Sequence, residues 1–477
     1  MMQKSASVGS GITKKTRVNK QSLQDPNEKT NEDSNSIAIT SKLRKQTSLA
    51  ADLKTSVEQS QMSKVLGGKI AQSMEIQRIK TAIKLDPKNA QHYVSLAEIL
   101  FEHNHINEAI QYFNKVIELE PKNYEHHLNF AKLLYEHNRT EECFEQFNIA
   151  IKKHPKQADI HLNYGKILFE QNMVDAAIDQ FKTAIKLHPK DPQYRFYLAK
   201  VYAEKSMFED ANDEYEKLIS MDPDNAEYFF NFAVTLENQN KLDDAIRRYK
   251  QAVKIEPKNA DFHFNLANAL YKIRKVDTAI AEYQKAIQIN PSKSDYHNNL
   301  GMVFYDNNLF EKAALEFEVA IKGNNKSALY HSNLGNALRQ QNQLEGAISQ
   351  FRWAIQFDPD NADYHNSIAF LLYKISQTDE AIKHYKRAIE LNPSNGDFYL
   401  SLGVVYAKQN NLDKLVEMLQ IAIQKSPENP NYHFSLAMAF SQQTNLPHAC
   451  QEFQHAIELD KTNPIYLFQY AALLGSS

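Results

Sequence analysis

Prolines recur at a fixed spacing along this sequence of 477 residues. Ten of its fifteen prolines fall on a single lattice with a period of 34 residues: Pro87, Pro121, Pro155, Pro189, Pro223, Pro257, Pro291, Pro359, Pro393 and Pro427. Asn325 and Lys461 occupy the two lattice points that lack proline, and no insertion or deletion disturbs the register. A fixed period of this length indicates tandem copies of one supersecondary unit. The lattice predicts eleven full copies over residues 90–463, with Ala90 as position 1 of the first.

Each copy has the pattern of two helices. In residues 260–293, apolar side chains recur at helical spacing on both sides of a polar break, and the pattern stops at Pro291. Position 8 is always Ala or Gly, and position 20 is Ala in nine of the eleven copies. Small residues at these positions let two helices approach closely. Position 24 is usually an aromatic residue such as Phe113 or Tyr249, which fills the space between the helices.

Asparagine marks the turns and the helix starts. A turn between two helices commonly needs a residue with left-handed backbone. Seven copies place asparagine there, which explains why the chain has only 12 glycines: Asn104, Asn138, Asn172, Asn240, Asn308, Asn342 and Asn410. Residues that cap helix N-termini precede the first helix at ten of twelve junctions. They are Asn89, Asn123, Asp191, Asn225, Asn259, Ser327, Asn361, Asn395, Asn429 and Asn463.

The N-terminal region has a different composition. Residues 1–45 are rich in Ser, Thr, Asn, Gln and Lys and carry a net positive charge, so we expect a disordered basic tail. The first 24 residues contain no acidic residue, which leaves either a solvated tail or an organelle transit peptide open. Residues 46–89 are expected to form a helical lead-in with a degenerate half repeat, and residues 464–477 a terminal helix.

Several function classes are disfavoured. No run of eighteen apolar residues exists, and the N-terminus lacks the apolar stretch of a secretory signal, so we expect a cytoplasmic protein, with a nuclear or ciliary location also open. Cys143 and Cys450 are too far apart to suggest a disulfide framework or a cysteine-based zinc site. The repeat region is net acidic, which disfavours nucleic acid as a partner.

Chemistry-bearing motifs are missing as well. There is no phosphate-binding glycine loop, no HExxH and no Cys-x-x-Cys, so we expect neither an enzyme nor a cofactor or metal site. Histidines recur at position 4 of seven copies, but a whole repeat of about 10 Å separates successive members, whereas the ligands of one ion lie about 2 Å from it. We therefore expect these side chains to contribute to packing: His127, His161, His263, His297, His331, His365 and His433.

The 34-residue period, with small residues at positions 8 and 20, an aromatic residue at 24, Ala at 27 and Pro at 32, resembles the tetratricopeptide repeat (TPR) family over about residues 56–477. The resemblance implies an all-α fold. It would be a right-handed superhelix, or α-solenoid, of eleven full helix-turn-helix repeats plus flanking half repeats. In this family the first helices face a concave groove through positions 2, 5, 6, 9, 12 and 13.

A row of asparagines occupies position 6 of this implied groove: Asn129, Asn163, Asn231, Asn265, Asn299 and Asn333. Carboxamides can pair with successive peptide groups of an extended ligand, or they can bond to neighbouring helices and only maintain the superhelix. The row resembles the repeat array of O-linked N-acetylglucosaminyltransferases, although the resemblance includes no catalytic domain. The carboxylate-binding clamp of chaperone-associated relatives is not supported, because Leu329 and Asn333 stand where its cations would be needed.

Aromatic and basic residues flank the asparagine row. Phe196, Phe230, Phe264, Tyr271 and Tyr305 form an aromatic stripe, which is typical of partner sites. Glutamate follows four residues after each of Lys132, Lys166 and Lys200, so these lysines either await a ligand or form a solvated face.

The sequence favours a non-catalytic scaffold or adaptor whose groove binds an extended segment of a partner protein. Two alternatives stay open. One is a substrate-recognition array serving an O-GlcNAc-type glycosyltransferase, and the other is a subunit of a large assembly of the ciliary-transport or ubiquitin-ligase type. Residues 464–477 form an apolar helix without the polar outer face expected of a terminal repeat, which predicts self-association or docking there.

Overall fold

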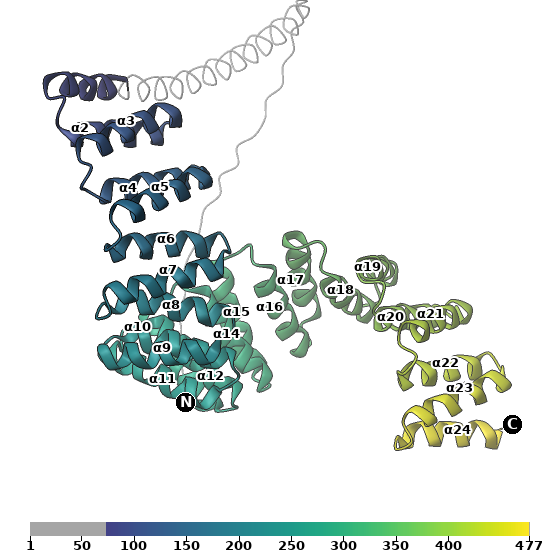
Figure 1. Cartoon of the computed structure of the whole chain (residues 1–477). Coiled ribbons are helices and arrows are strands. Elements are labelled where there is room, and N and C mark those ends of the chain that lie inside the picture. Colours follow the sequence, from purple (N-terminus) through teal and green to yellow (C-terminus); the bar gives the residue numbers. More distant parts are fainter. Residues whose placement is uncertain (1–72, 477) are drawn as a thin grey trace, which may run out of the picture. The chain divides into compact units, whose positions relative to one another are not determined.

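The computed structural model describes residues 73–476, and within this range all regular structure is helical. A helix over residues 73–85 precedes α2–α24 (Figure 1). The predicted all-α class and the tandem-repeat architecture are confirmed. The predicted tail at residues 1–45, and the part of the lead-in before residue 73, lie outside the described residues.

Each repeat contributes two helices, which we call the A helix and the B helix. The A helices, followed by α24 at the C-terminal end, are α2 (Ala90–Glu102), α4 (Glu125–Glu136), α6 (Ala158–Glu170), α8 (Pro192–Glu204), α10 (Ala226–Asn238), α12 (Ala260–Lys272), α14 (Ser294–Asp306), α16 (Ala328–Gln340), α18 (Ala362–Lys374), α20 (Gly396–Lys408), α22 (Pro430–Gln442) and α24 (Pro464–Ser476). The B helices are α3 (Ile106–Leu119), α5 (Thr140–Lys153), α7 (Val174–Leu187), α9 (Phe208–Met221), α11 (Leu242–Ile255), α13 (Val276–Ile289), α15 (Phe310–Gly323), α17 (Leu344–Phe357), α19 (Thr378–Leu391), α21 (Leu412–Lys425) and α23 (Leu446–Leu459).

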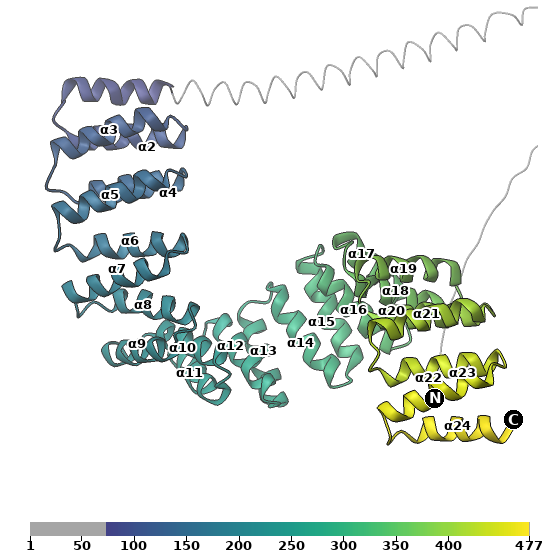
Figure 2. The ribbon, with the colours of Figure 1, turned by 45° about the vertical axis from the view of Figure 1, so that its right-hand side comes forward.

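The chain divides into two compact units between Pro155 and Lys156. The first contains α2–α5, and the second contains α6–α24. Within each unit, a helix packs mainly on its neighbours in the sequence, so the hairpins follow one another in chain order (Figure 2). Such stacking means that each repeat is stabilised by itself and by its two neighbours. None of the helices in residues 73–476 combines the length and the apolar character that a membrane span requires.

The turn between the A and B helices has the same backbone in all eleven repeats. The residue at position 15 has φ between 58° and 64°, which is left-handed. The seven predicted asparagines adopt this conformation, and so do Ser206, Arg274, Ser376 and Thr444, which have no intrinsic preference for it. In the first repeat, the His105 N–H donates to the Leu100 carbonyl at 2.8 Å. This bond satisfies a carbonyl at the helix end, and the geometry is imposed even where the side chain disfavours it.

The predicted caps also form. Every predicted capping side chain except one accepts a hydrogen bond from a backbone N–H at the start of its A helix. Asn259 is the exception, and its amide donates to the Glu256 carboxylate at 3.2 Å. The capped starts and the left-handed turns together fix where each helix begins and ends.

Close contact between positions 8 and 24 holds each hairpin together. A Cβ added at Gly301 would lie 2.7 Å from the ring of Phe317, and one at Gly335 would lie 2.9 Å from Phe351. The ring of the B helix therefore rests on the backbone of the A helix. Cys143, at position 20, is fully buried, and burial raises the pKa of its thiol to about 12. It behaves as a small core side chain.

Candidate protein-binding groove

The position-4 histidines fasten each hairpin and take no part in the face formed by the A helices. In the repeat that begins at α16, Nδ1 of His331 lies 2.7 Å from Oε1 of Gln350 on α17, and Nε2 lies 3.1 Å from the Asn325 carbonyl. The ring therefore links the A helix to its B helix and to the loop that precedes it. Contacts with position 23 recur at the other position-4 histidines: His127, His161, His263, His297, His365 and His433.

The asparagines at position 6 use part of their hydrogen-bonding capacity on their own helices. Asn163, Asn231 and Asn265 each donate to the backbone carbonyl four residues earlier, at 2.8 Å. No side chain among residues 73–476 is seen donating to their Oδ1 atoms. Each amide therefore keeps an acceptor and a second N–H for a ligand.

The later asparagines belong to a network between repeats. Asn299 donates to Oδ1 of Asn268 at 3.1 Å, and Asn333 donates to Oδ1 of Asn298 at 2.8 Å. These bonds join α12, α14 and α16. Asn129 lies in the first unit and is exposed, so the row as a ligand surface is described here only for the second unit.

The predicted phenylalanines at position 5 fill the joints between successive A helices. Each is half-buried and packs on the ring at position 3 of the next repeat. The ring-centroid distances are 5.4 Å for Phe196–Tyr228, 4.8 Å for Phe230–Phe262 and 4.8 Å for Phe264–Tyr296. These rings therefore present only part of their surface to a ligand.

The three predicted lysines differ in what they contact. Lys132 lies 3.8 Å from the Glu136 carboxylate, in the first unit. Lys166 Nζ lies 4.0 Å from the ring centroid of Tyr197, and Lys200 Nζ lies 5.6 Å from that of Phe196. Two of the three therefore cover aromatic rings instead of pairing with the glutamate four residues on.

Positions 12 and 13 make complementary contacts at four of the joints between A helices. At these joints, the side chain at position 13 contacts the side chain at position 12 of the preceding repeat. The pairs are Lys272 with Glu237 at 2.8 Å, Asp306 with the hydroxyl of Tyr271, Gln340 with the hydroxyl of Tyr305 at 3.3 Å, and Lys408 over the ring of Tyr373 at 4.8 Å. Burial and the bond to Asp306 raise the pKa of Tyr271 to about 12.

The joint between α16 and α18 differs from these four because it carries two cations. Arg339 holds position 12 on α16, and Lys374 holds position 13 on α18. Neither makes an ion pair with any carboxylate in the described part of the chain. Lys374 Nζ lies only over the ring of Phe370, 5.3 Å from its centroid.

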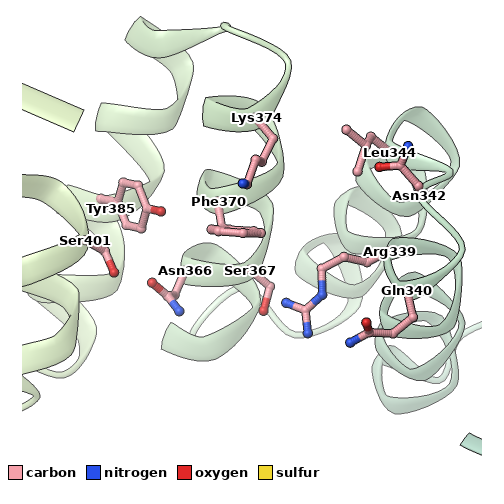
Figure 3. Close-up of a pocket in the computed structure, with 10 residues that line it drawn as sticks. All are labelled: Arg339, Gln340, Asn342, Leu344, Asn366, Ser367, Phe370, Lys374, Tyr385 and Ser401. Carbon is pink, nitrogen blue, oxygen red and sulfur yellow. The ribbon is translucent and has the colours of Figure 1, made fainter. Parts of the chain in front are cut away.

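A cavity of about 510 Å³ opens at this joint. Figure 3 shows Asn366, Ser367, Phe370 and Lys374 along one face of α18, with Arg339 reaching from α16 towards Ser367. The remaining lining residues are Gln340, Asn342, Leu344, Tyr385 and Ser401. No carboxylate lines the cavity.

The cavity contains one buried polar atom without a hydrogen-bond partner and one exposed apolar ring. Oδ1 of Asn366 is buried and accepts no hydrogen bond, which is costly for a polar atom. Phe370 is 39% exposed although it is a large apolar side chain. Position 6 is serine on α18 and α20, at Ser367 and Ser401, so the shorter side chains leave the space that asparagine fills elsewhere.

The cavity itself was not predicted from the sequence, and none of its lining residues belongs to the predicted asparagine row, aromatic stripe or lysine set. Two sequence features could have indicated the cavity. The asparagine row ends at Asn333, and the cations Arg339 and Lys374 stand 35 residues apart, at positions 12 and 13 of consecutive repeats. Their significance depends on the contacts between consecutive A helices, which a single repeat does not reveal.

These hairpins match the models of a known protein family. Models described as TPR repeat match residues 165–206, 235–273, 275–308, 335–376 and 372–410, and models described as tetratricopeptide repeat match residues 90–123 and 214–247. The comparison with curated proteins returns no match.

Solved structures that are similar to this chain include YrrB, Cut9–Hcn1 and yeast Tom70. One is YrrB, "a TPR protein with an unusual peptide-binding site", at 24% identity, covering 38% of this chain and 92% of that chain, with a TM-score of 0.35. Another is the APC/C hetero-tetramer Cut9–Hcn1, at 12% identity over 85% of this chain and 94% of that chain, with a TM-score of 0.40. The third is yeast Tom70, at 14% identity over 81% and 96%, with a TM-score of 0.38. Because the repeat models together match about half of the chain, and the hairpins keep one register from α2 to α23, the chain belongs to the tetratricopeptide repeat family.

Proposed function

We propose that this protein is a non-catalytic interaction scaffold that binds an extended segment of a partner protein along the A helices of its second unit. An acidic residue of that segment is seated between Arg339 and Lys374. The observation that carries the proposal is the joint between α16 and α18, where two cations without ion-pair partners stand in place of the complementary pairs seen at four other joints.

The chemistry of the cavity selects the ligand. A carboxylate restores the charge complementarity of the joint, and the guanidinium of Arg339 can hold it through two parallel hydrogen bonds. A peptide N–H donor satisfies the buried Oδ1 of Asn366, which otherwise costs about 1–3 kcal/mol. An apolar side chain next to the acidic residue covers the exposed ring of Phe370.

An extended peptide fits the neighbouring surface as well. Its backbone alternates donors and acceptors, and the carboxamides of Asn163, Asn231 and Asn265 offer the same pair of groups from α6, α10 and α12. The asparagines bind whatever the side chains of the ligand are, whereas the cavity at Arg339 supplies the preference for an acidic residue. The two parts of the surface therefore divide affinity and specificity between them.

A selection of random linear peptides on the full chain tests this proposal. We expect enrichment of sequences in which Asp or Glu neighbours an apolar residue. The double substitution Arg339→Gln and Lys374→Gln removes two charge-assisted contacts of about 1.5–3 kcal/mol each, so binding of the enriched peptides falls at least tenfold.

A charge-matched control accompanies the double substitution. Lys383→Gln with Lys386→Gln removes the same charge from exposed positions of α19 outside the cavity, and it leaves the affinity unchanged. Peptides without an acidic bias, or equal losses in both double variants, would exclude the site.

The asparagine row supports a second candidate, the recognition of substrate segments for a separate O-GlcNAc-type glycosyltransferase. The same surface serves a subunit of a large assembly, and a cytoplasmic, nuclear or ciliary location stays a prediction. Substitution of Asn163, Asn231 and Asn265 by Ala separates the candidates. The glycosyltransferase role requires that such a variant loses glycosylated partners in a pull-down, while the purified chain alone transfers no sugar.

A further inference from the structure

We propose that the last full repeat binds a divalent transition-metal ion of the zinc type between α22 and α23, through His433, Glu452 and His455. Nδ1 of His433 lies 2.7 Å from Oε2 of Glu452, and Nδ1 of His455 lies 3.8 Å from the same oxygen. The three ligand atoms all lie within 4.8 Å of one another. Among residues 73–476, no other group of three histidine, cysteine or carboxylate side chains converges in this way.

Hydrogen bonding orients the ring of His433 for this role. Nε2 of His433 lies 3.0 Å from the carbonyl of Pro427, and because a carbonyl can only accept, Nε2 carries the proton. In the neutral ring, Nδ1 then presents a lone pair to the Glu452 carboxylate. Two acceptors at 2.7 Å need a cation between them, either a proton or a metal ion. Histidines that bind metals commonly donate their other ring N–H to a carbonyl in the same manner.

Two other repeats provide an internal comparison. The pairs His263–Glu282 and His297–Glu316 repeat the histidine–glutamate contact at positions 4 and 23. What differs is position 26, three residues after the glutamate. It is Lys285 after Glu282, Val319 after Glu316 and His455 after Glu452.

The side chain at position 26 determines whether a metal ion can bind between the two helices. Lys285 Nζ lies 2.8 Å from Glu282, so the carboxylate there already has a cation beside it. Val319 offers no ligand atom. His455 brings a ring nitrogen, Nδ1, which is buried without a hydrogen-bond partner. Of these three repeats, the one formed by α22 and α23 alone combines a third ligand with a polar atom that lacks a partner.

The types of ligand atom determine which class of metal ion the site prefers. Two imidazole nitrogens and one carboxylate oxygen suit Zn²⁺ and similar ions, whereas Ca²⁺ and Mg²⁺ prefer oxygen ligands. Metal–ligand bonds of about 2.0–2.1 Å in a tetrahedral site place the ligand atoms about 3.3 Å apart. The 3.8 Å pair would close by about 0.5 Å, which side-chain rotation of the half-exposed His455 allows, and the 2.7 Å pair would open by about 0.6 Å through rotation of the Glu452 side chain.

Such an ion would fasten α22, α23 and the loop at Pro427 together. It would stabilise the repeat on which α24 packs. Metal binding would therefore strengthen the C-terminal end of the second unit and leave the cavity at Arg339 unchanged.

Zinc titration of the full, metal-stripped chain against a chromophoric chelator tests the inference. We expect one Zn²⁺ per chain that His455→Lys and His455→Val each weaken at least 100-fold. These variants recreate the position-26 residues Lys285 and Val319 of the other two repeats, so the hairpin keeps its histidine–glutamate contact. Co²⁺ serves as a second probe, since its visible absorption reports nitrogen ligation directly.

Two further measurements separate this site from binding by other histidines. His384→Gln removes a different histidine pair and leaves the zinc affinity unchanged. Zn²⁺ raises the melting temperature of the wild type but not of His455→Lys, because a ligand stabilises only the state that binds it. Equal zinc affinity in the wild type, His455→Lys and His455→Val, or no binding at micromolar zinc, would overturn the proposal.

Discussion

Replacing Thr444 tests the claim that the repeat imposes a left-handed turn on side chains that resist it. Thr444 is exposed, β-branched and held at φ 59° between α22 and α23. Its backbone N–H and that of Asn445 close the turn, and its hydroxyl bonds only to the neighbouring Gln443 carbonyl. Little but the conformation therefore depends on this side chain.

The magnitude follows from the conformation. Left-handed backbone costs an L-residue about 1–2 kcal/mol, and asparagine is among the residues that tolerate it. Thr444→Asn should therefore stabilise this repeat by about 1 kcal/mol. Thr444→Gly relieves the same strain but loses about 0.5–1 kcal/mol to the freedom of glycine in the unfolded chain, so its net gain is smaller. Asn240→Gly is the matched control, because Asn240 already suits its φ of 60°.

Hydrogen exchange measures the effect locally, in peptides from α22 and α23 for the Thr444 variants and from α10 and α11 for Asn240→Gly. A local measurement suits a solenoid whose repeats open separately. A gain of about 1 kcal/mol slows exchange about fivefold, since 1.4 kcal/mol corresponds to a factor of ten. Unchanged exchange in Thr444→Asn, or slower exchange in Asn240→Gly than in Thr444→Gly, would refute the reasoning.

Three further predictions concern packing, pH dependence and assembly. Gly301→Ala should destabilise the protein by about 1–2 kcal/mol, because its Cβ meets the buried Phe317 ring at 2.7 Å. Gly346→Ala should stabilise the protein slightly, because its Cβ meets only the tip of Leu338 at 3.3 Å. Urea unfolding measures both changes in stability, and changes of the same sign would contradict this prediction. Burial lowers the pKa of both His365 and His384, so both are neutral in the folded chain and gain protons on unfolding; stability is complete above about pH 6.5 and falls as the pH drops below it. His384→Gln, which copies Gln350 of the preceding repeat, should flatten melting temperature against pH between 6.5 and 5, and an unchanged slope would argue against the pair. Exposed apolar side chains on α24, including Phe468 at 70%, should give concentration-dependent mass in light scattering that Phe468→Glu abolishes, and a monomer at all concentrations would disprove self-association there.

The repeat pattern predicted what depends on local signals. Pro at position 32, asparagine at the turn and a cap before each A helix act within a few residues, so the hairpins follow from the sequence. Arg274 and Thr444 carry no such signal, and their left-handed turns result from the packing of the flanking helices.

The candidate site depended on contacts between repeats. The asparagine row was predicted from side-chain chemistry, but the extent to which its amides bond to their own helix, as Asn231 does with Glu227, depends on rotamers. The cavity at Arg339 was missed because its meaning lies in a pair of side chains 35 residues apart. Complementarity at four other joints is what makes two cations at one joint informative.

The joints between A helices also set how the second unit responds to force. Lys272 and Glu237 attract across their joint, so separating α10 from α12 at that edge works against an ion pair. Arg339 and Lys374 repel across theirs, which makes the edge between α16 and α18 the more compliant. A bound carboxylate would turn this repulsion into attraction. The stiffness of that joint would then depend on whether the cavity holds a carboxylate, so a bound partner would change the force needed to separate α16 from α18.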